Sequence, residues 1–389
     1  MTNHSARASA LGYSYQPRYA LLLLLRGGSN VSLYIERFDD IEILNETGQN
    51  LVQLKNRKAG NLSDSGSDLW KTLKIWLDLY REGKIDLDNV ELTIITTASA
   101  KQNSAASMLG INKRNPVIAA QILERIASQS KNVKQKKYYS AFLRLQPHER
   151  TKLLERVTIL DSSPNVVKIA DEIRRELRRT TRKEYLNAFM ERLEGWWTDH
   201  VIRHLSGESD EPISGATLDA KIGDLREQFF ADNLPIDYRN LSLTKRDKKS
   251  AKEKIFVKQL ELLMLKEPRI LSAIYDYYKA YNQRSRWIKD DLIYFDELEN
   301  YRNRLIDEWK RRFDRMNDIL STSPDQRSKI EEGKKIYDWV EFETDFCIRP
   351  RCTEPYVVRG TYHMLANELD VGWRSDFFQE LKHLLIEMK

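Results

Sequence analysis

The chain of 389 residues is 41% hydrophobic and 31% charged, so it is too apolar to be disordered and long enough for two or three domains. Its 64 lysines and arginines exceed its 58 acidic residues, and the resulting charge of +6 permits nucleic-acid contact without indicating a protein that coats DNA. Two cysteines exclude a disulfide scaffold, and the longest apolar run, residues 19–25, is too short to span a membrane. With no secretory signal before that run, we expect a cytoplasmic protein.

The first hundred residues predict a mixed α+β domain. Pro17 is typical of the first position of a helix, and Gly27-Gly28 should end that helix. Alternating apolar and polar residues then predict three strands joined by short turns, over 31–35, 40–43 and 49–54. Short turns between consecutive strands indicate an antiparallel meander.

A second helix and a fourth strand complete this domain. Apolar positions at helical spacing predict a helix over 69–80, and the β-branched residues of 90–95 predict a strand. The predicted order is therefore α-β-β-β-α-β. After residue 110 the pattern is mostly helical, interrupted by loop-forming residues in 161–165 and 204–213 and by a lysine-rich run over 245–254. We divide the chain into 1–160, a helical middle region 161–244, and a C-terminal domain 245–389.

Polar residues on neighbouring strands form the candidate site. Alternation places Gln53 and Lys55 on the same face of the third strand. On the second strand, Ile41 and Ile43 should face the core, which leaves Asp40 and Glu42 beside Gln53 and Lys55. The pattern predicts that a carboxylate, an amide oxygen and a lysine converge.

This set suits phosphodiester hydrolysis with a divalent cation. Mg²⁺ or Mn²⁺ takes oxygen ligands, which Asp40 and the Gln53 amide can supply, with Glu36 or Asp39 completing the shell. The cation would activate a water, and Lys55 would orient the nucleophile or stabilise the developing negative charge. The sequence does not decide which of Asp39 and Asp40 binds metal.

The arrangement resembles the PD-(D/E)xK nuclease superfamily, in the Mrr-like variant where Gln replaces the second acid. The matching residues are Asp40 or Asp39 and Gln53-Leu54-Lys55, within the α-β-β-β-α-β order of that superfamily's core. The segments 12–16 and 36–40 also resemble the endonuclease domain of CBASS effectors, which suggests a site role for Gln16. The resemblance covers roughly residues 10–100 and implies a nuclease.

The C-terminal third resembles a second family. The residues of 301–309, 359–366 and 371–374 look like the C-terminal domain of effectors in bacterial ABC-three-component defence systems of the Lamassu type. This resemblance implies a nuclease effector held in check by an SMC-like ABC ATPase and a small middle subunit. We expect a Mg²⁺-dependent endonuclease that degrades double-stranded DNA with low sequence specificity and acts as a homo-oligomer.

Other interpretations stay open at this point. The polar strand residues could be a solvated sheet face, the domain could be an inactive nuclease fold that serves as a DNA-binding or assembly subunit, and RNA could be the substrate. The basic stripe over 174–183 is typical of a solvated helix face, with a DNA-backbone or subunit contact as alternatives. We expect the tryptophans to lie in the core, with Trp373 the best candidate among them for an interface anchor.

Overall fold

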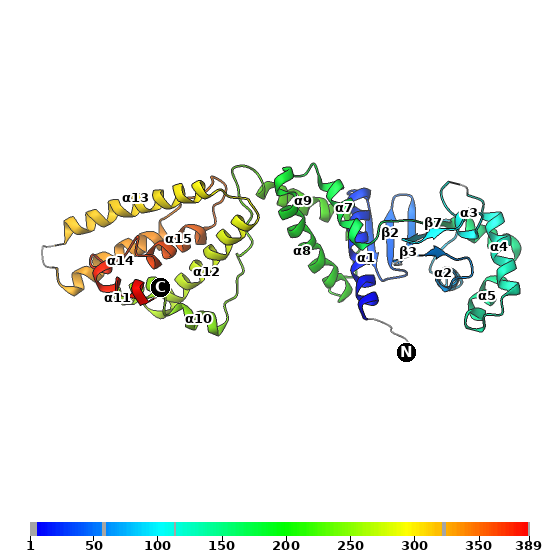
Figure 1. Ribbon diagram of the computed structural model, residues 1–389, viewed down its shortest axis with the longest axis horizontal. Coiled ribbons are helices and arrows are strands. Elements are labelled where there is room, and N and C mark those ends of the chain that lie inside the picture. The colour runs from blue at the N-terminus through cyan, green and yellow to red at the C-terminus, as the bar shows by residue number, and fades with distance from the viewer. Residues whose placement is uncertain (1–5, 57–59, 113, 321–323, 388–389) are drawn as a thin grey trace. The chain divides into compact units, whose positions relative to one another are not determined.

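The computed structural model describes residues 6–56, 60–112, 114–320 and 324–387, which form two compact units, 1–224 and 225–389 (Figure 1). The first unit contains a mixed sheet with helices, and the second is helical, so the predicted α+β class is confirmed. The division falls inside a helix near residue 225 and coincides with neither predicted boundary. The helices within residues 166–205 belong to the first unit because they pack on its N-terminal helix.

The N-terminal helix α1 (Ala6–Gly27) is longer than predicted. Pro17 lies inside it, so the predicted start of the helix at this residue is wrong. The helix tolerates Pro17 although proline lacks the N–H of an interior position, and the Pro17 carbonyl accepts a hydrogen bond from the Trp197 indole at 2.7 Å. Gly28, with φ of 73°, ends the helix as expected, since its N–H bonds the Leu24 carbonyl.

The three predicted strands form the predicted antiparallel meander: β1 (Ser32–Ile35), β2 (Ile41–Asn45) and β3 (Gly48–Lys55). The expected strand β5 (Val90–Thr96) pairs with β3 in parallel, and the helix between them is α2 (Ser67–Arg81). The predicted α-β-β-β-α-β order is therefore confirmed.

The sheet has two further edge strands that the sequence did not predict. β7 (Val157–Leu160) adds in parallel to β5, and β8 (Ile213–Ser214) pairs with β1, giving the order β7-β5-β3-β2-β1-β8. A small parallel pair, β4 (Asn61–Leu62) and β6 (Ser99–Ala100), lies beyond the ends of β3 and β5.

Helices complete the first unit. On the side of α2, a core centred on Trp70, Leu73, Leu92 and Phe142 joins that helix to the sheet. The helices of this group are α3 (Ala105–Met108), α4 (Pro116–Gln129), the 3₁₀ turn η1 (Val133–Gln135), α5 (Lys136–Leu143) and α6 (Pro147–Arg156). Those nearer α1 are α7 (Val166–Leu177), the 3₁₀ turn η2 (Lys183–Tyr185), α8 (Leu186–Leu205) and α9 (Gly215–Gln228).

The second unit is a helical domain with its own aromatic core. Its helices are α10 (Lys245–Ala251), α11 (Ile255–Leu262), α12 (Glu267–Lys289), α13 (Phe295–Ile319), α14 (Gln326–Phe342), α15 (Pro355–Asn367), α16 (Phe377–Leu381) and α17 (Leu384–Glu387). Helices α12 and α15 approach closely at Gly360, where a Cβ atom would lie 2.1 Å from the Asp276 carbonyl oxygen. No side chain larger than hydrogen fits there.

Trp373 belongs to this core. It is 0% exposed and packs edge-on against Tyr337, so the prediction of an interface anchor at this residue is wrong. Trp287 and Trp309 are buried as well, and their indole N–H groups donate to the backbone carbonyls of Pro235 and Gly372. In neither unit does the described part of the chain contain a helix long and apolar enough to cross a membrane.

Candidate functional site

The predicted site residues gather at one edge of the sheet. β2 begins where β3 ends, because the two strands are antiparallel and Ile41 lies opposite Val52. Asp39 and Asp40 directly precede β2, and Gln53 and Lys55 lie in the last three positions of β3. The meander therefore brings the acidic pair and the Gln-x-Lys segment to the same edge.

A hydrogen bond joins Asp40 to the end of β3. Its Oδ2 atom accepts from the backbone N–H of Leu54 at 2.7 Å. Leu54 lies between Gln53 and Lys55, so this bond fixes the Asp40 carboxylate beside both. No hydrogen bond to the other carboxylate oxygen, Oδ1, is found within the described residues.

Asp39 is held more tightly than Asp40. It is 9% exposed, and its Oδ2 atom accepts from the Trp76 indole N–H at 2.6 Å while Oδ1 accepts from the Asp40 backbone at 2.9 Å. Burial raises the pKa of Asp39 to about 6, the negative charge of Asp40 adds to that rise, and the positive charge of Lys55 opposes it. The opposing effect of Lys55 means that its ammonium group lies within electrostatic range of the acidic pair.

Gln53 and Lys55 differ in their surroundings. Gln53 is 5% exposed, and its Oε1 atom accepts from the Thr72 hydroxyl on α2 at 3.4 Å, a long bond. Lys55 is half-buried, and no ion pair or hydrogen bond of its ammonium group is found among the residues that the structure describes. A lysine without a partner at a polar edge is available to bind an anion.

The Glu42 side chain is buried and paired, so it does not join the site residues as the sequence predicts. It is completely buried opposite Leu51, and its carboxylate accepts from Arg37 at 2.8 Å and from the Gln49 amide at 2.6 Å. The expectation that Glu42 stays free beside Gln53 and Lys55 is wrong, because a buried carboxylate requires a cation and hydrogen bonds of its own. Ile43, expected in the core, is half-buried.

Glu36 and Gln16 lie apart from the hydrogen bonds that organise the edge. Glu36 is exposed in the turn after β1 with a positive φ of 59°, and its backbone N–H donates to the Asp40 carbonyl at 3.1 Å. Gln16 lies half-buried within α1. Neither side chain has a hydrogen bond to the acidic pair within the described residues.

The donor set suits a hard cation that keeps part of its water shell. The negative charge of Asp40 helps to raise the pKa of Asp39, and a divalent cation would relieve that repulsion. Asp40 and the Gln53 carbonyl are the oxygen ligands at hand, and Mg²⁺ commonly binds through one or two carboxylates plus water and phosphate. No group of three His, Cys, Asp or Glu side chains suited to a metal is found in the described ranges, so the protein alone would not enclose the ion.

Two side chains on α2 that support the site were missed. Trp76 was assigned to the apolar face of α2, and Thr72 gave no signal, yet their polar atoms contact Asp39 and Gln53. The period of the apolar residues identifies the face of α2 that packs on the sheet. It does not identify which polar groups of the sheet that face contacts.

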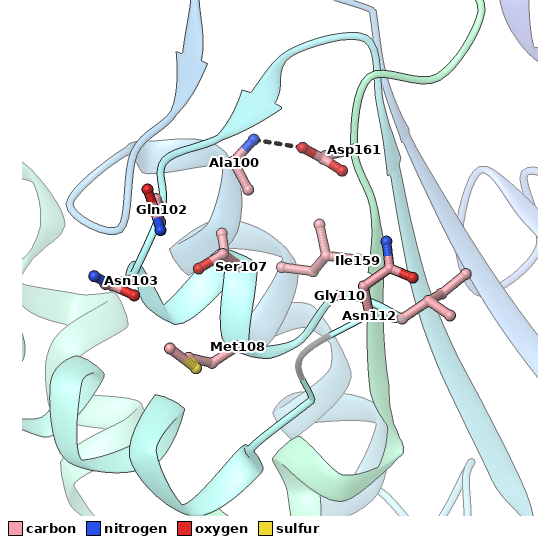
Figure 2. Close-up of a pocket in the computed structure, with 11 residues that line it drawn as sticks. Ala100, Gln102, Asn103, Ser107, Met108, Gly110, Asn112, Ile159 and Asp161 are labelled. Carbon is pink, nitrogen blue, oxygen red and sulfur yellow. Dashed lines mark hydrogen bonds between the residues drawn. The ribbon is translucent and has the colours of Figure 1, made fainter.

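A small cavity beyond the ends of β5 and β7 was also missed (Figure 2). It has a volume of about 220 Å³, and uncharged polar side chains, among them Gln102, Ser107 and Asn112, point toward it. At its margin Asp161 accepts from the Ala100 N–H at 2.7 Å. The sequence marked 161–165 only as a break in the helical pattern, because the second wall of the cavity follows β7, which was not predicted.

The first unit thus combines a mixed sheet with an acidic pair beside the Gln-x-Lys end of β3. This arrangement has the donor groups for a cation and a lysine for an anion. In the second unit, residues 256–381 match the family described as C-terminal domain 7 of the ABC-three component (ABC-3C) systems. The match supports the assignment of the chain as a component of an ABC-3C defence system. No curated protein matches the chain in sequence.

Solved structures offer only a distant likeness. The chain is similar to the Acinetobacter baumannii Cap4 SAVED/CARF-domain containing receptor with the cyclic trinucleotide 3'3'3'-cAAA, at 14% identity and a TM-score of 0.35, over 70% of this chain and 66% of that one. The Moraxella osloensis Cap4 SAVED/CARF-domain containing receptor gives 11% identity and a TM-score of 0.33, over 70% and 68% of the two chains. The chain thus spans about two thirds of these structures, and scores this low say nothing of its function.

Proposed function

We propose that this protein is the effector of an ABC-3C defence system of the Lamassu type and that it is a metal-dependent endonuclease that degrades double-stranded DNA with low sequence specificity. The observation that carries the chemistry is the bond between Asp40 and the Leu54 N–H, which holds a carboxylate beside Gln53 and Lys55, a lysine with no ion pair among the described residues. The match of residues 256–381 supports the system.

The side chains of the edge have distinct roles in this proposal. Asp40 and the Gln53 carbonyl would hold Mg²⁺ or Mn²⁺, which supplies Lewis-acid chemistry when bound, and the exposed Glu36 reaches the ion through water or not at all. Lys55 binds the scissile phosphate and stabilises the negative charge that develops on its oxygens. Asp39, anchored by Trp76, keeps the edge negative and fixes the backbone of Asp40.

The proposed substrate implies that the nuclease must be held inactive in its own cell. A nuclease of low specificity in the cytoplasm must be inactive until foreign DNA is sensed, and we assign that control to an SMC-like ABC ATPase and a small middle subunit. Activation would pair two copies of the site across a duplex, as a homo-oligomer.

The second unit offers a surface for such a partner. A groove of about 340 Å³ between α10 and α12 has an apolar floor that includes Ile270, Leu271 and Ile274. Its rim carries four lysines, Lys245, Lys248, Lys249 and Lys252, and one acid, Glu267, which pairs with Lys252 at 3.1 Å. An apolar floor with a predominantly basic rim fits an amphipathic acidic segment.

The second candidate is an inactive nuclease fold that binds DNA or assembles the complex. The intact set of Asp40, Gln53 and Lys55 argues against it, because a degenerate site has no reason to keep an unpaired lysine beside two carboxylates. RNA is the alternative substrate, since it offers the same phosphodiester.

The test is cleavage of supercoiled plasmid by the purified chain, alone and bound to its operon partners. We expect nicking and linearisation with Mg²⁺ or Mn²⁺, weak cleavage with Ca²⁺, whose larger shell positions water poorly, and none with EDTA. Full activity in excess EDTA would reject the mechanism. Parallel reactions on single-stranded and double-stranded RNA decide the substrate, and inactivity of every preparation on every substrate would favour the inactive fold.

A further inference from the structure

A basic groove lies on the first unit, between α2 and the segment formed by η1 and α5. Helices α2 and α5 are in contact, and Figure 1 shows them as neighbours. Lys74, Asp78 and Arg81 follow one another at helical spacing along α2. Lys137, Ser140, Ala141 and Arg144 do the same along α5, and Val133, Lys134 and Lys136 close one end. The groove has a volume of about 630 Å³.

Most of the cations in this groove have no acidic partner. Asp78, the one carboxylate in the lining, binds Lys74 within its own helix. The Arg81 guanidinium donates to the Ala141 carbonyl at 3.2 Å, which draws it across the groove. No ion pair of the remaining cations, Lys134, Lys136, Lys137 and Arg144, is found in the described part of the chain, and all four are exposed.

The concentration of charge is the decisive feature. Six cations and one carboxylate line the groove, for a net charge of +5, whereas the whole chain of 389 residues carries +6. Like charges gathered on neighbouring helices repel one another, which destabilises the unit unless an anion binds between them. The structure therefore holds a surface that is complementary to a polyanion.

We propose that this groove binds the phosphate backbone of duplex DNA at a position separate from the cleavage edge. Lysine and arginine side chains that extend from exposed helices are the usual contacts to phosphate oxygens, and they confer affinity without sequence specificity. The small Ser140 and Ala141 side chains on the α5 wall leave room for a backbone to approach. An acidic protein partner fits less well, because the lining contains almost none of the aromatic or large apolar anchors that protein interfaces use.

Helix α2 contributes side chains to both the cleavage edge and the basic groove. Thr72 and Trp76 of α2 contact Gln53 and Asp39 at the cleavage edge, while Lys74 and Arg81 line the groove. A duplex held in the groove is thus bound to the element that positions the acidic pair. This inference takes its ligand from the proposed function, so its test measures binding without cleavage.

The test is binding of the full chain to a fluorescein-labelled 30-base-pair duplex by anisotropy, in EDTA and at a series of KCl concentrations. The groove variant is Lys134→Gln, Lys137→Gln, Arg144→Gln, and the matched control, Arg125→Gln, Lys168→Gln, Lys289→Gln, removes three charges from exposed positions outside the groove. We expect the groove variant to bind at least about tenfold more weakly. The slope of log K against log[KCl] should become shallower by about 2 to 3, because each phosphate that a cation neutralises adds about 0.9 to the slope.

Equal affinity and slope for the groove variant and the wild type would overturn the proposal, as would an equal weakening in the control. Loss of copurification with an operon partner at unchanged duplex affinity would also overturn it and make the groove a protein-binding surface. The plasmid assay is independent of these results: a wild type that binds through the groove but never cleaves overturns the nuclease alone, and one that cleaves while the groove variant binds normally overturns the groove alone.

Discussion

The two units of the chain differ in how some of their cationic side chains are paired. In the second unit several buried or partly buried arginines are paired: Arg349 bonds both oxygens of Glu297 at 2.6 and 2.9 Å, Arg269 bonds Asp338 and Glu341, and Arg374 bonds Asp376. In the first unit, Lys55 at the sheet edge and four cations of the basic groove have no such partner within the described residues.

This contrast indicates where each unit interacts with other molecules. Paired arginines and buried tryptophans stabilise the second unit from within, and the lysine-rimmed groove is one of its open features. Unpaired cations in the first unit cost stability unless they bind an anion. We therefore propose that the first unit contacts nucleic acid and that the second unit contacts protein partners.

The largest expected effect is that of Lys55→Ala on cleavage. Loss of the ammonium group removes the cation that stabilises the developing phosphate charge, so plasmid nicking should fall at least about 10²- to 10³-fold. The melting temperature should stay that of the wild type, because Lys55 is half-buried at a strand end and its removal opens no core cavity.

The matched control is Lys71→Ala, which removes a lysine from an exposed position of α2. It should cleave as the wild type does. A Lys55→Ala protein that melts normally and nicks plasmid at the normal rate would show that the site is elsewhere.

Trp373→Ala should have the opposite effect to Lys55→Ala: the protein should lose stability but keep its cleavage activity. The side chain is 0% exposed in the core of the second unit, so its truncation should cost about 3 to 5 kcal/mol. Denaturant unfolding followed by tryptophan fluorescence should show a destabilised transition, while plasmid cleavage below that transition persists. Trp373→Phe should cost less, because the indole N–H has no hydrogen-bond partner to lose within the described residues. Equal stability of Trp373→Ala and the wild type would contradict the buried position.

Trp373 illustrates what the sequence could not predict. A tryptophan beside a Val-Gly turn has the same local pattern in a core and at an interface, and only packing against Tyr337 distinguishes them. Pro17 was misplaced for a similar reason, since proline is allowed at a helix start and tolerated inside a long helix that packs well. The strand β7 follows α6 without a break, so its four residues looked like the end of the helix.

The site edge was predictable because the short turns that join consecutive strands are local. Placing Asp39 and Asp40 beside Gln53 and Lys55 needs only the meander, which the sequence predicts correctly. The basic groove needs contacts between α2 and α5, which lie far apart in the chain, and no local pattern reports such a contact.

Asp39 should contribute mainly to stability, and Asp40 mainly to cleavage. Asp39→Ala leaves the buried Trp76 indole N–H without its acceptor, which should cost about 1 to 3 kcal/mol in the free energy of unfolding. Asp39→Asn keeps an oxygen acceptor and should recover most of that loss. Asp40→Asn should melt nearly as the wild type does and lose cleavage, because the carboxylate charge is absent. Equal stability of Asp39→Ala and Asp39→Asn would show that the indole bond contributes nothing.

The lysine rim of the second unit should govern partner affinity. Charge reversal by Lys248→Glu and Lys249→Glu in the full chain should weaken copurification with the ATPase or middle subunit about tenfold, since rim charges steer and orient an acidic segment. Lys289→Glu with Lys382→Glu makes the same change of charge at exposed positions outside the groove. Unchanged stoichiometry for the rim variant, or an equal weakening in the control, would place the partner surface elsewhere.

The smallest effect concerns Asp276, on α12 in the second unit. Burial raises its pKa to about 6, although the positive charges of Arg359 and Lys279 oppose the rise. The folded state therefore binds the proton more tightly than the unfolded state does. The stability due to the protonated form is complete below about pH 4, falls as the pH rises toward 6, and is absent above 6.

Asp276→Asn is uncharged at every pH and should raise the free energy of unfolding by about 1 to 2 kcal/mol at pH 7.5, with the gain vanishing near pH 4. Urea unfolding at several pH values measures this, with the exposed Asp318→Asn as a control that should leave the shape of the pH profile unchanged. Parallel profiles for Asp276→Asn and the wild type would mean that the carboxylate is solvated. A second unit that gains stability on losing the Asp276 charge would show that this buried carboxylate is retained at a cost to stability above pH 6.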